Sequence, residues 1–155
     1  MAGDASIIEQ VETLQSQSTS NPTSISQWAA VEAITGDQSV VADMVAAFER
    51  RRNIIVGGLN GVPGFSCVNP NGAFYAFPGV KKVFSMKGWA GIEKKYKSEF
   101  KSSKLSSYLL EEAKVAVVPG IAFGTDDNIR LSFATSDENI IEGVRRINSA
   151  IQKLL

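Results

Sequence analysis

Apolar residues along this chain change repeatedly between helical and strand spacing, and their order limits the folds that it can adopt. Helices are predicted at residues 5–14, 22–36, 38–59 and 102–114, and from a cap at Ser136 to the C-terminus. Strands are predicted at residues 65–68, 73–77, 115–118 and 129–133. This order predicts an α/β fold in which helices cover at least one face of a small mixed sheet.

Three features of this prediction are specific enough to test. The first two strands are expected to pair as a hairpin around residues 69–72, and residues 115–118 to form a buried strand. Residues 15–21 are expected to form a loop, and residues 78–101 to cross the surface with one short helix. Two helices should bury apolar stripes, one made of Val41, Met44, Val45, Phe48, Ile55 and Leu59, the other of Ile140, Ile141, Val144, Ile147 and Ile151.

A change in composition near Gly36 predicts a boundary between two parts of the chain. The serine-rich residues 1–36 offer two short helices and little core of their own, whereas residues 37–155 carry the long helix and every predicted strand. We therefore expect residues 37–155 to be compact. The first 36 residues are expected to expose apolar surface, which would be covered by a partner or by self-association.

The composition excludes several classes of function. The chain has 155 residues, 44% of them hydrophobic, with 16 basic and 16 acidic residues that cancel, so no binding of nucleic acid is expected. The single Cys67 allows no internal disulfide, and the absence of histidine removes the commonest metal ligand and general base. No apolar run approaches membrane-spanning length. We expect a cytoplasmic protein without a metal site.

Three segments together resemble the C-terminal portion of class I, fold-type I aminotransferases, most closely the bacterial aspartate aminotransferases. They are SQSTSNP at residues 16–22, GAFY at 72–75, and VAVVPG at 115–120 followed by RLSFATS at 130–136. The resemblance covers essentially the whole chain, in the family's order and spacing. It implies that residues 1–36 end the large cofactor domain and that residues 37–155 form the small domain.

The resemblance assigns substrate binding to Arg130 and Phe74. An arginine can donate two parallel charge-assisted hydrogen bonds to one carboxylate, which fixes both position and orientation. In the family, the arginine of this strand holds the substrate α-carboxylate, and Phe74 would lie at the pocket that the small domain closes. The alternatives are a surface arginine on a strand and an aromatic residue in ordinary packing.

The polar loop before Pro22 resembles a segment that the family extends toward the active site of the neighbouring subunit. Ser18 and Thr19 are therefore candidates for that site, although a helix-capping loop would contain the same residue types. Ser16 stands where some subgroups carry an arginine for a second substrate carboxylate. A preference for aspartate would then have to come from residues outside this chain.

The lysine that holds pyridoxal phosphate in this family has no counterpart in the chain. The segment KVFSMKGW at residues 82–89 is similar to the family's lysine segment, but it follows the GAFY strand instead of preceding the serine-rich loop. We interpret Lys82 as a chance match and expect the true lysine upstream of Ala2. The chain alone should then have no catalytic residues, bind no pyridoxal phosphate and catalyse no transamination.

These observations predict part of a homodimeric aminotransferase that uses pyridoxal phosphate in its full-length form. It would transfer an amino group between an amino acid, aspartate first, and a 2-oxo acid, with Arg130 holding the carboxylate of each. Prephenate, alanine or an aromatic amino acid are alternative substrates for the same chemistry. A non-catalytic interaction module is the alternative from another class.

Overall fold

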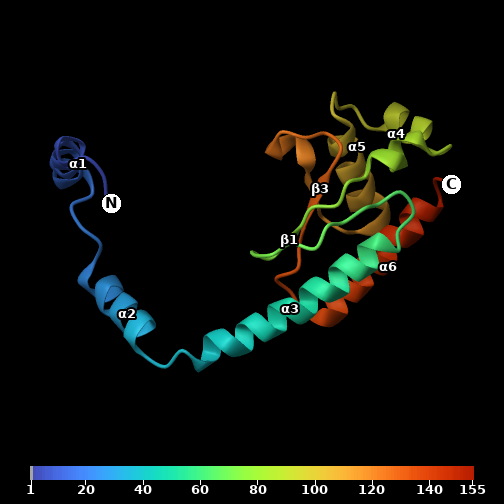
Figure 1. Cartoon of the computed structure of the whole chain (residues 1–155). Helices are drawn as coiled ribbons and strands as arrows, with labels where there is room; N and C mark the ends of the chain where they lie inside the picture. The colour runs from blue at the N-terminus through green and yellow to red at the C-terminus, as the bar shows by residue number, and fades with distance from the viewer. Residues whose placement is uncertain (1) are drawn as a thin grey trace. The chain divides into compact units, whose positions relative to one another are not determined.

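The computed structural model describes residues 2–155, which divide into an N-terminal unit ending at Ala42 and a C-terminal unit, Asp43–Leu155. The α-helices are α1 (Ala5–Ser18), α2 (Ser24–Thr35), α3 (Ser39–Asn60), α4 (Trp89–Lys95), α5 (Lys101–Tyr108) and α6 (Asp137–Gln152). Short 3-10 helices are η1 (Lys81–Ser85) and η3 (Gly120–Phe123), and η2 (Leu109–Ala113) is a π-helical turn. The strands are β1 (Tyr75–Ala76), β2 (Val118–Pro119) and β3 (Ile129–Ser132) (Figure 1). The predicted α/β class is confirmed.

The N-terminal unit consists of α1, α2 and the first turn of α3, and α1 and α2 bury no residue. Asp4 and Thr23 cap α1 and α2 by accepting hydrogen bonds from the amides of Ser6 and Ser26. The loop predicted from residue 15 is wrong for its first four residues. Helix α1 continues to Ser18, and within it the Ser18 hydroxyl donates to the Leu14 carbonyl. A polar composition alone therefore did not mark the end of the helix.

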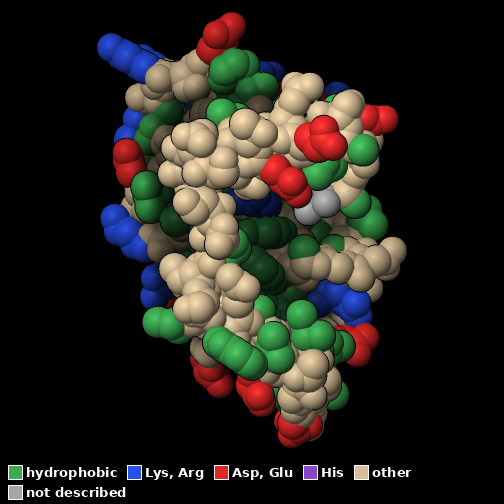
Figure 2. All heavy atoms as spheres, turned by 90° about the vertical axis from the view of Figure 1, so that its left-hand side faces the viewer, with side chains coloured by type: hydrophobic (Ala, Val, Ile, Leu, Met, Phe, Trp, Pro, Cys, Tyr) green, Lys and Arg blue, Asp and Glu red, His purple; other side chains and the backbone are tan. Residues whose placement is uncertain are grey.

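Large apolar side chains of the N-terminal unit are exposed, as the sequence predicted. Before Gly36 they are Ile7, Leu14, Ile25, Trp28, Val31 and Ile34. Val40 and Val41 of α3 are exposed too, which corrects the burial predicted for Val41. Figure 2 shows hydrophobic side chains reaching the surface on the face that it draws. The stripe predicted for α3 is buried only in its second half, because Met44 and Val45 are exposed whereas Ile55 and Leu59 belong to the core.

The sheet is antiparallel throughout, which corrects the predicted mixed sheet. Its order is β1-β3-β2, with Tyr75 opposite Ser132 on one side of β3 and Val118 opposite Arg130 on the other. The strand that is central in space is therefore last in sequence. Strands β1 and β2 never pair with each other, and each depends on β3 for its hydrogen bonds.

The predicted hairpin between residues 65–68 and 73–77 is wrong. The Asn60 side chain makes two hydrogen bonds to the backbone of Cys67. It accepts from the Cys67 amide at 2.8 Å and donates to the Cys67 carbonyl at 3.0 Å. Because Asn60 at the end of α3 holds Cys67, Ser66 is the one residue of 65–68 that forms a β-bridge, and its partner is Gly79. The predicted second strand is then free to pair with β3.

Helices α3 and α6 pack against each other in the C-terminal unit (Figure 1). A Cβ at Gly58 of α3 would lie 2.9 Å from Cγ1 of Val144 in α6, so the close approach requires glycine at this point. Ile140, Ile147 and Ile151 of α6 are buried as predicted. Ile141 is 57% exposed and corrects that stripe, since it flanks the row formed by residues 140, 144, 147 and 151.

Two further predictions about burial were wrong. Residues 78–101 do not simply cross the surface, because Val80, Val83, Trp89, Ile92 and Tyr96 belong to the core. The strand predicted as buried over 115–118 begins only at Val118, which is 36% exposed. It is an edge strand, and an apolar run alone does not distinguish an edge strand from a central one.

The Asp126 carboxylate joins the loop before β3 to the first turn of α5. It accepts hydrogen bonds from the amides of Lys101 (2.9 Å) and Ser102 (2.8 Å) and from the Ser102 hydroxyl (2.7 Å). These amides lie at a helix start, where they have no partner within the helix. Asp126 therefore caps α5 from a distant part of the sequence, and the buried Ser102 hydroxyl in turn accepts from the amide of Ile121.

Replacing Asp126 by alanine should lower the free energy of unfolding by about 2 kcal/mol, since it removes a helix cap and leaves a buried hydroxyl without its acceptor. Urea unfolding at pH 7 measures this. Asp127→Ala is the matched control, because its carboxylate makes only an exposed ion pair with Lys81 and should cost about 0.5 kcal/mol or less. Equal effects of the two substitutions would contradict the capping role.

The same comparison should depend on pH. Partial burial acts to raise the pKa of Asp126, but the hydrogen bonds from Ser102 and Lys101 outweigh it and leave the pKa below its ordinary value of 3.8. A lowered folded-state pKa gives stability that is present above the unfolded value and lost as the pH falls through the folded value. The stability difference between wild type and Asp126→Ala should therefore shrink below about pH 3.8, and a constant difference down to pH 2 would contradict this assignment.

Candidate functional site

Arg130 lies in β3, where successive side chains point to opposite faces of the sheet. Ile129 and Leu131 on either side of it are buried in the core, so Arg130 projects from the other face and is half-buried there. Register places Val118 of β2 beside Arg130 and Tyr75 of β1 beside Ser132. The guanidinium therefore stands on the middle strand, with a strand on each side.

Two aromatic rings contact the guanidinium. Its Cζ lies 4.2 Å from the ring centroid of Tyr75 and 4.3 Å from that of Phe123. Both distances are well inside the roughly 6 Å over which a cation is attracted to a ring face. Tyr75 belongs to β1 and Phe123 ends η3, which directly follows β2. The rings therefore reach Arg130 from the segments that flank β3 on its two sides.

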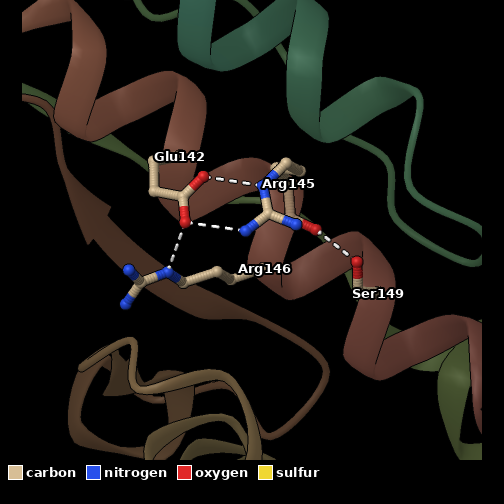
Figure 3. Close-up of polar contacts among 4 residues, drawn as sticks. All are labelled: Glu142, Arg145, Arg146 and Ser149. Atoms are coloured by element: carbon tan, nitrogen blue, oxygen red, sulfur yellow. Dashed lines mark hydrogen bonds and ion pairs between the residues drawn. The ribbon is translucent and has the colours of Figure 1, made fainter.

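Arg130 differs from the other arginines in having no acidic partner among residues 2–155. The other five each lie between 2.6 and 3.6 Å from a carboxylate oxygen. Figure 3 shows two of them, Arg145 and Arg146 of α6, sharing the carboxylate of Glu142. Within the described residues the Arg130 guanidinium makes no hydrogen bond, so its N–H donors are available to an acid group.

Phe74 lies next to this arrangement but does not stack on the guanidinium. Its ring is 4.5 Å from that of Tyr75 and 6.1 Å from that of Phe48 in α3, and it is 39% exposed. Its carbonyl accepts from the amide of Phe133, which extends the pairing of β1 with β3. Phe74 is therefore connected to Arg130 only through the ring of Tyr75.

The loop between β2 and β3 is held tightly around Gly120. The Gly120 amide donates to the Asn128 carbonyl at 2.9 Å, and its own carbonyl accepts from Thr125 at 3.2 Å. A Cβ at Gly120 would lie 2.2 Å from the Asn128 oxygen, which no side chain can do without moving the loop. Glycine at this position therefore permits the tight loop that contains Phe123.

The other predicted site residues lie elsewhere in the chain. Ser18 is the last residue of α1 and Thr19 its C-cap, both exposed and both in the N-terminal unit. Lys82 lies in η1 of the C-terminal unit and is exposed. The roles predicted for Arg130, Phe74, Ser18 and Thr19 stay predictions.

No group of three or more His, Cys, Asp and Glu side chains within residues 2–155 is arranged to hold a metal ion. In the same residues, no helix has both the length and the apolar character needed to cross a membrane.

Comparison of the sequence with models of protein families identifies the family of this chain. The family described as aminotransferase class I and II matches residues 1–147. The chain belongs to this family. The family was predicted from three short segments, and that prediction is confirmed.

Relatives within the aminotransferase family are similar over nearly the whole chain. An aspartate aminotransferase of Geobacillus stearothermophilus is 48% identical over 95% of the chain, and one of Bacillus subtilis is 43% identical over 98%. Among solved structures, an aspartate aminotransferase of Rhizobium meliloti has a TM-score of 0.87 at 38% identity over 99% of the chain. The chain spans only 35% to 37% of the length of these three proteins.

Sequence reasoning missed the two rings that contact Arg130. Phe123 was not among the predicted site residues, and Tyr75 was included only as part of the GAFY strand. The missing information was the pairing of β1: placing this strand beside residues 65–68 put Tyr75 far from Arg130. An alternating pattern shows which residues share a face, but not which strand lies next to them.

The contrast between the paired arginines and Arg130 can be measured by titration. Hydrogen bonds from Arg145, and then from Arg146, lower the pKa of Glu142 from 4.5 to about 2. In a chain carrying Arg145→Gln and Arg146→Gln, the Glu142 pKa should return toward 4.5, as followed by NMR of its side-chain carboxyl carbon. Arg130→Gln is the control and should leave the Glu142 pKa unchanged. A Glu142 pKa near 4.5 in the wild type would contradict the observed pairing.

Proposed function

We propose that this chain supplies the carboxylate-binding part of an aminotransferase, with Arg130 receiving the α-carboxylate of both the amino acid and the 2-oxo acid. The observation that carries the proposal is the free guanidinium on β3, in a chain that belongs to this family. An unpaired, half-buried cation costs stability, and it is retained where a ligand completes its charge.

Geometry supports a carboxylate as the ligand. A guanidinium presents two N–H groups along one edge, which match the two oxygens of a carboxylate. The contacts that Arg130 makes with Tyr75 and Phe123 run from its central carbon to the ring faces and use no donor. The edges therefore stay free, and a substrate bound there would be fixed in orientation as well as in place.

Pyridoxal phosphate, when bound, supplies the carbonyl and the electron-withdrawing ring on which transamination depends. The lysines of residues 2–155 do not fit the role of its anchor: all are exposed except the half-buried Lys104. A lysine activated for this chemistry is desolvated or lies next to another cation. We therefore assign the cofactor to the whole protein and only the carboxylate to this chain.

The substrate is proposed from the names of the relatives. Those of Geobacillus stearothermophilus and Bacillus subtilis are aspartate aminotransferases, and one of Nitrosomonas europaea is an aspartate/prephenate aminotransferase. We propose aspartate as the amino donor, with prephenate as the alternative oxo acid. Every amino acid and 2-oxo acid carries the carboxylate that Arg130 would bind, so the proposal for Arg130 does not depend on this choice.

A homodimer and a cytoplasmic location are proposed from the same relationship. The exposed apolar side chains of α1 and α2 support association, because surface of this kind is usually covered in an assembly. Ser18 and Thr19 would then contribute to the active site of the second subunit.

Binding by the 155-residue chain tests the role of Arg130 directly. Addition of 2-oxoglutarate should shift the Arg130 Nε–H resonance in a saturable way, and Arg130→Gln should weaken binding by at least about tenfold, since charge-assisted hydrogen bonds contribute about 1.5–3 kcal/mol. Arg145→Gln, which removes an arginine already paired with Glu142, should bind like the wild type. Saturable binding that survives Arg130→Gln would sink the proposal.

Activity can be tested in a chimaera that carries this chain in place of the matching part of the Geobacillus stearothermophilus enzyme. Transamination of aspartate is expected, with kcat/KM lowered about tenfold to hundredfold by Arg130→Gln. Comparing aspartate, alanine and phenylalanine as amino donors would settle the substrate. A folded chimaera that binds pyridoxal phosphate but transfers no amino group would favour a non-catalytic module.

A further inference from the structure

The Arg130 side chain is long and flexible, yet the structure holds its charged end between neighbouring elements. An arginine side chain that is free in solution must lose considerable rotamer freedom to bind a ligand in one orientation. Less is lost if the protein has already restricted it. The question is which residues restrict Arg130, since no hydrogen bond from residues 2–155 does so.

Tyr75 and Phe123 are the two side chains placed to do this. Their ring centroids lie at nearly equal distances, 4.2 and 4.3 Å, from the guanidinium carbon. They come from elements on the two sides of β3, one from β1 and one from the 3-10 helix after β2. Contacts from two sides restrict a planar group more than a single stacking contact.

Both rings are themselves supported by other aromatic residues. Tyr75 packs on Phe74, which packs on Phe48 of α3. Phe123 makes an edge-to-face contact with Phe77 at 5.9 Å. The loop that carries Phe123 is closed by the hydrogen bonds of Gly120 and by the Asp126 cap on α5. A continuous set of contacts therefore connects the guanidinium to the two helices α3 and α5.

Burial of apolar surface does not account for the position of Phe123. Its side chain is 46% exposed, so it gains little from contact with the core, and its neighbour Ala122 is exposed as well. What Phe123 contacts is the charged group of Arg130 and the edge of another exposed ring, Phe77. Its place in the fold is best explained by its effect on Arg130.

We propose that Tyr75 and Phe123 are positioning residues that hold the Arg130 guanidinium in its binding orientation and so raise its affinity for a carboxylate. They act through their ring faces and leave the N–H edges free. The inference rests on the proposed function for its ligand, and it adds two residues that determine how well Arg130 performs it.

The first measurement needs only the wild-type chain. NMR relaxation of arginine Nε–H groups should show that Arg130 is more rigid on the picosecond-to-nanosecond timescale than Arg145, which lies exposed on α6 with an ion pair. An Arg130 side chain as mobile as that of Arg145 would overturn the positioning inference. It would leave the proposed carboxylate binding untouched.

The second measurement removes one ring at a time. Tyr75→Leu and Phe123→Leu should each raise the mobility of Arg130 and weaken 2-oxoglutarate binding by roughly threefold to tenfold, the range expected for losing one cation–ring contact. Tyr75→Phe keeps the ring and should behave like the wild type. Phe100→Leu is the matched control, because Phe100, the N-cap of α5, is exposed to a similar degree and makes no ring contact with Arg130.

The outcomes separate the two proposals. If both leucine variants keep a native backbone spectrum and bind 2-oxoglutarate as tightly as the wild type, the inference is wrong while the role of Arg130 stands. If the wild-type Arg130 resonance does not respond to 2-oxoglutarate at all, the proposed function fails and the ligand part of this inference fails with it. Weakened binding in Phe100→Leu as well would assign the effect to general destabilisation and overturn the specific role of the rings.

Discussion

The pairing of β3 with a strand on each side is the constraint on which the C-terminal unit depends. Only four residues form this strand, yet β1 and β2 make no pairing with each other and both align on it. One face of β3 buries Ile129 and Leu131 in the core that α3 and α6 help to form. The other face carries Arg130. Packing of one face of β3 in the core thus fixes the position of Arg130 on the other face.

The surroundings of Arg130 reflect a compromise between stability and binding. Elsewhere in the described residues the fold neutralises its arginines with carboxylates, as Glu142 does for Arg145 and Arg146 (Figure 3). At Arg130 it provides aromatic faces instead. A ring attracts a cation without using its hydrogen-bond donors, whereas a carboxylate would occupy them. Aromatic contacts are therefore the way to hold an arginine that must still bind an acid.

The Asp126 cap shows how a distant residue supports this arrangement. By accepting from the first amides of α5 and from Ser102, it fastens the loop between β2 and β3 to a helix of the core. That loop contains η3 and hence Phe123. The stability of the β2–β3 loop and the rigidity of the Arg130 guanidinium are consequently linked, because movement of the loop would also move the Phe123 ring.

The amino-acid sequence alone was sufficient for much of this protein. The helix predicted from residue 22, the cap at Ser136, the strand at residues 129–133, the exposed apolar side chains before Gly36 and membership of the aminotransferase family could all be predicted from it. These are local matters: Ser136 lies next to the helix that it caps, and periodicity is set by the neighbours of each residue. Family motifs are also read over a few adjacent positions.

Tertiary structure decided which segments are neighbours. The turn-like residues 69–72 favoured a hairpin. Instead, the Asn60 side chain hydrogen-bonds to the Cys67 backbone, and β1 pairs with β3. The same choice put Tyr75 over Arg130, and the closed loop at Gly120 brought Phe123 to it. Strand partners and capping residues far apart in sequence are selected by the free energy of the whole packed unit, and no local pattern contains that information.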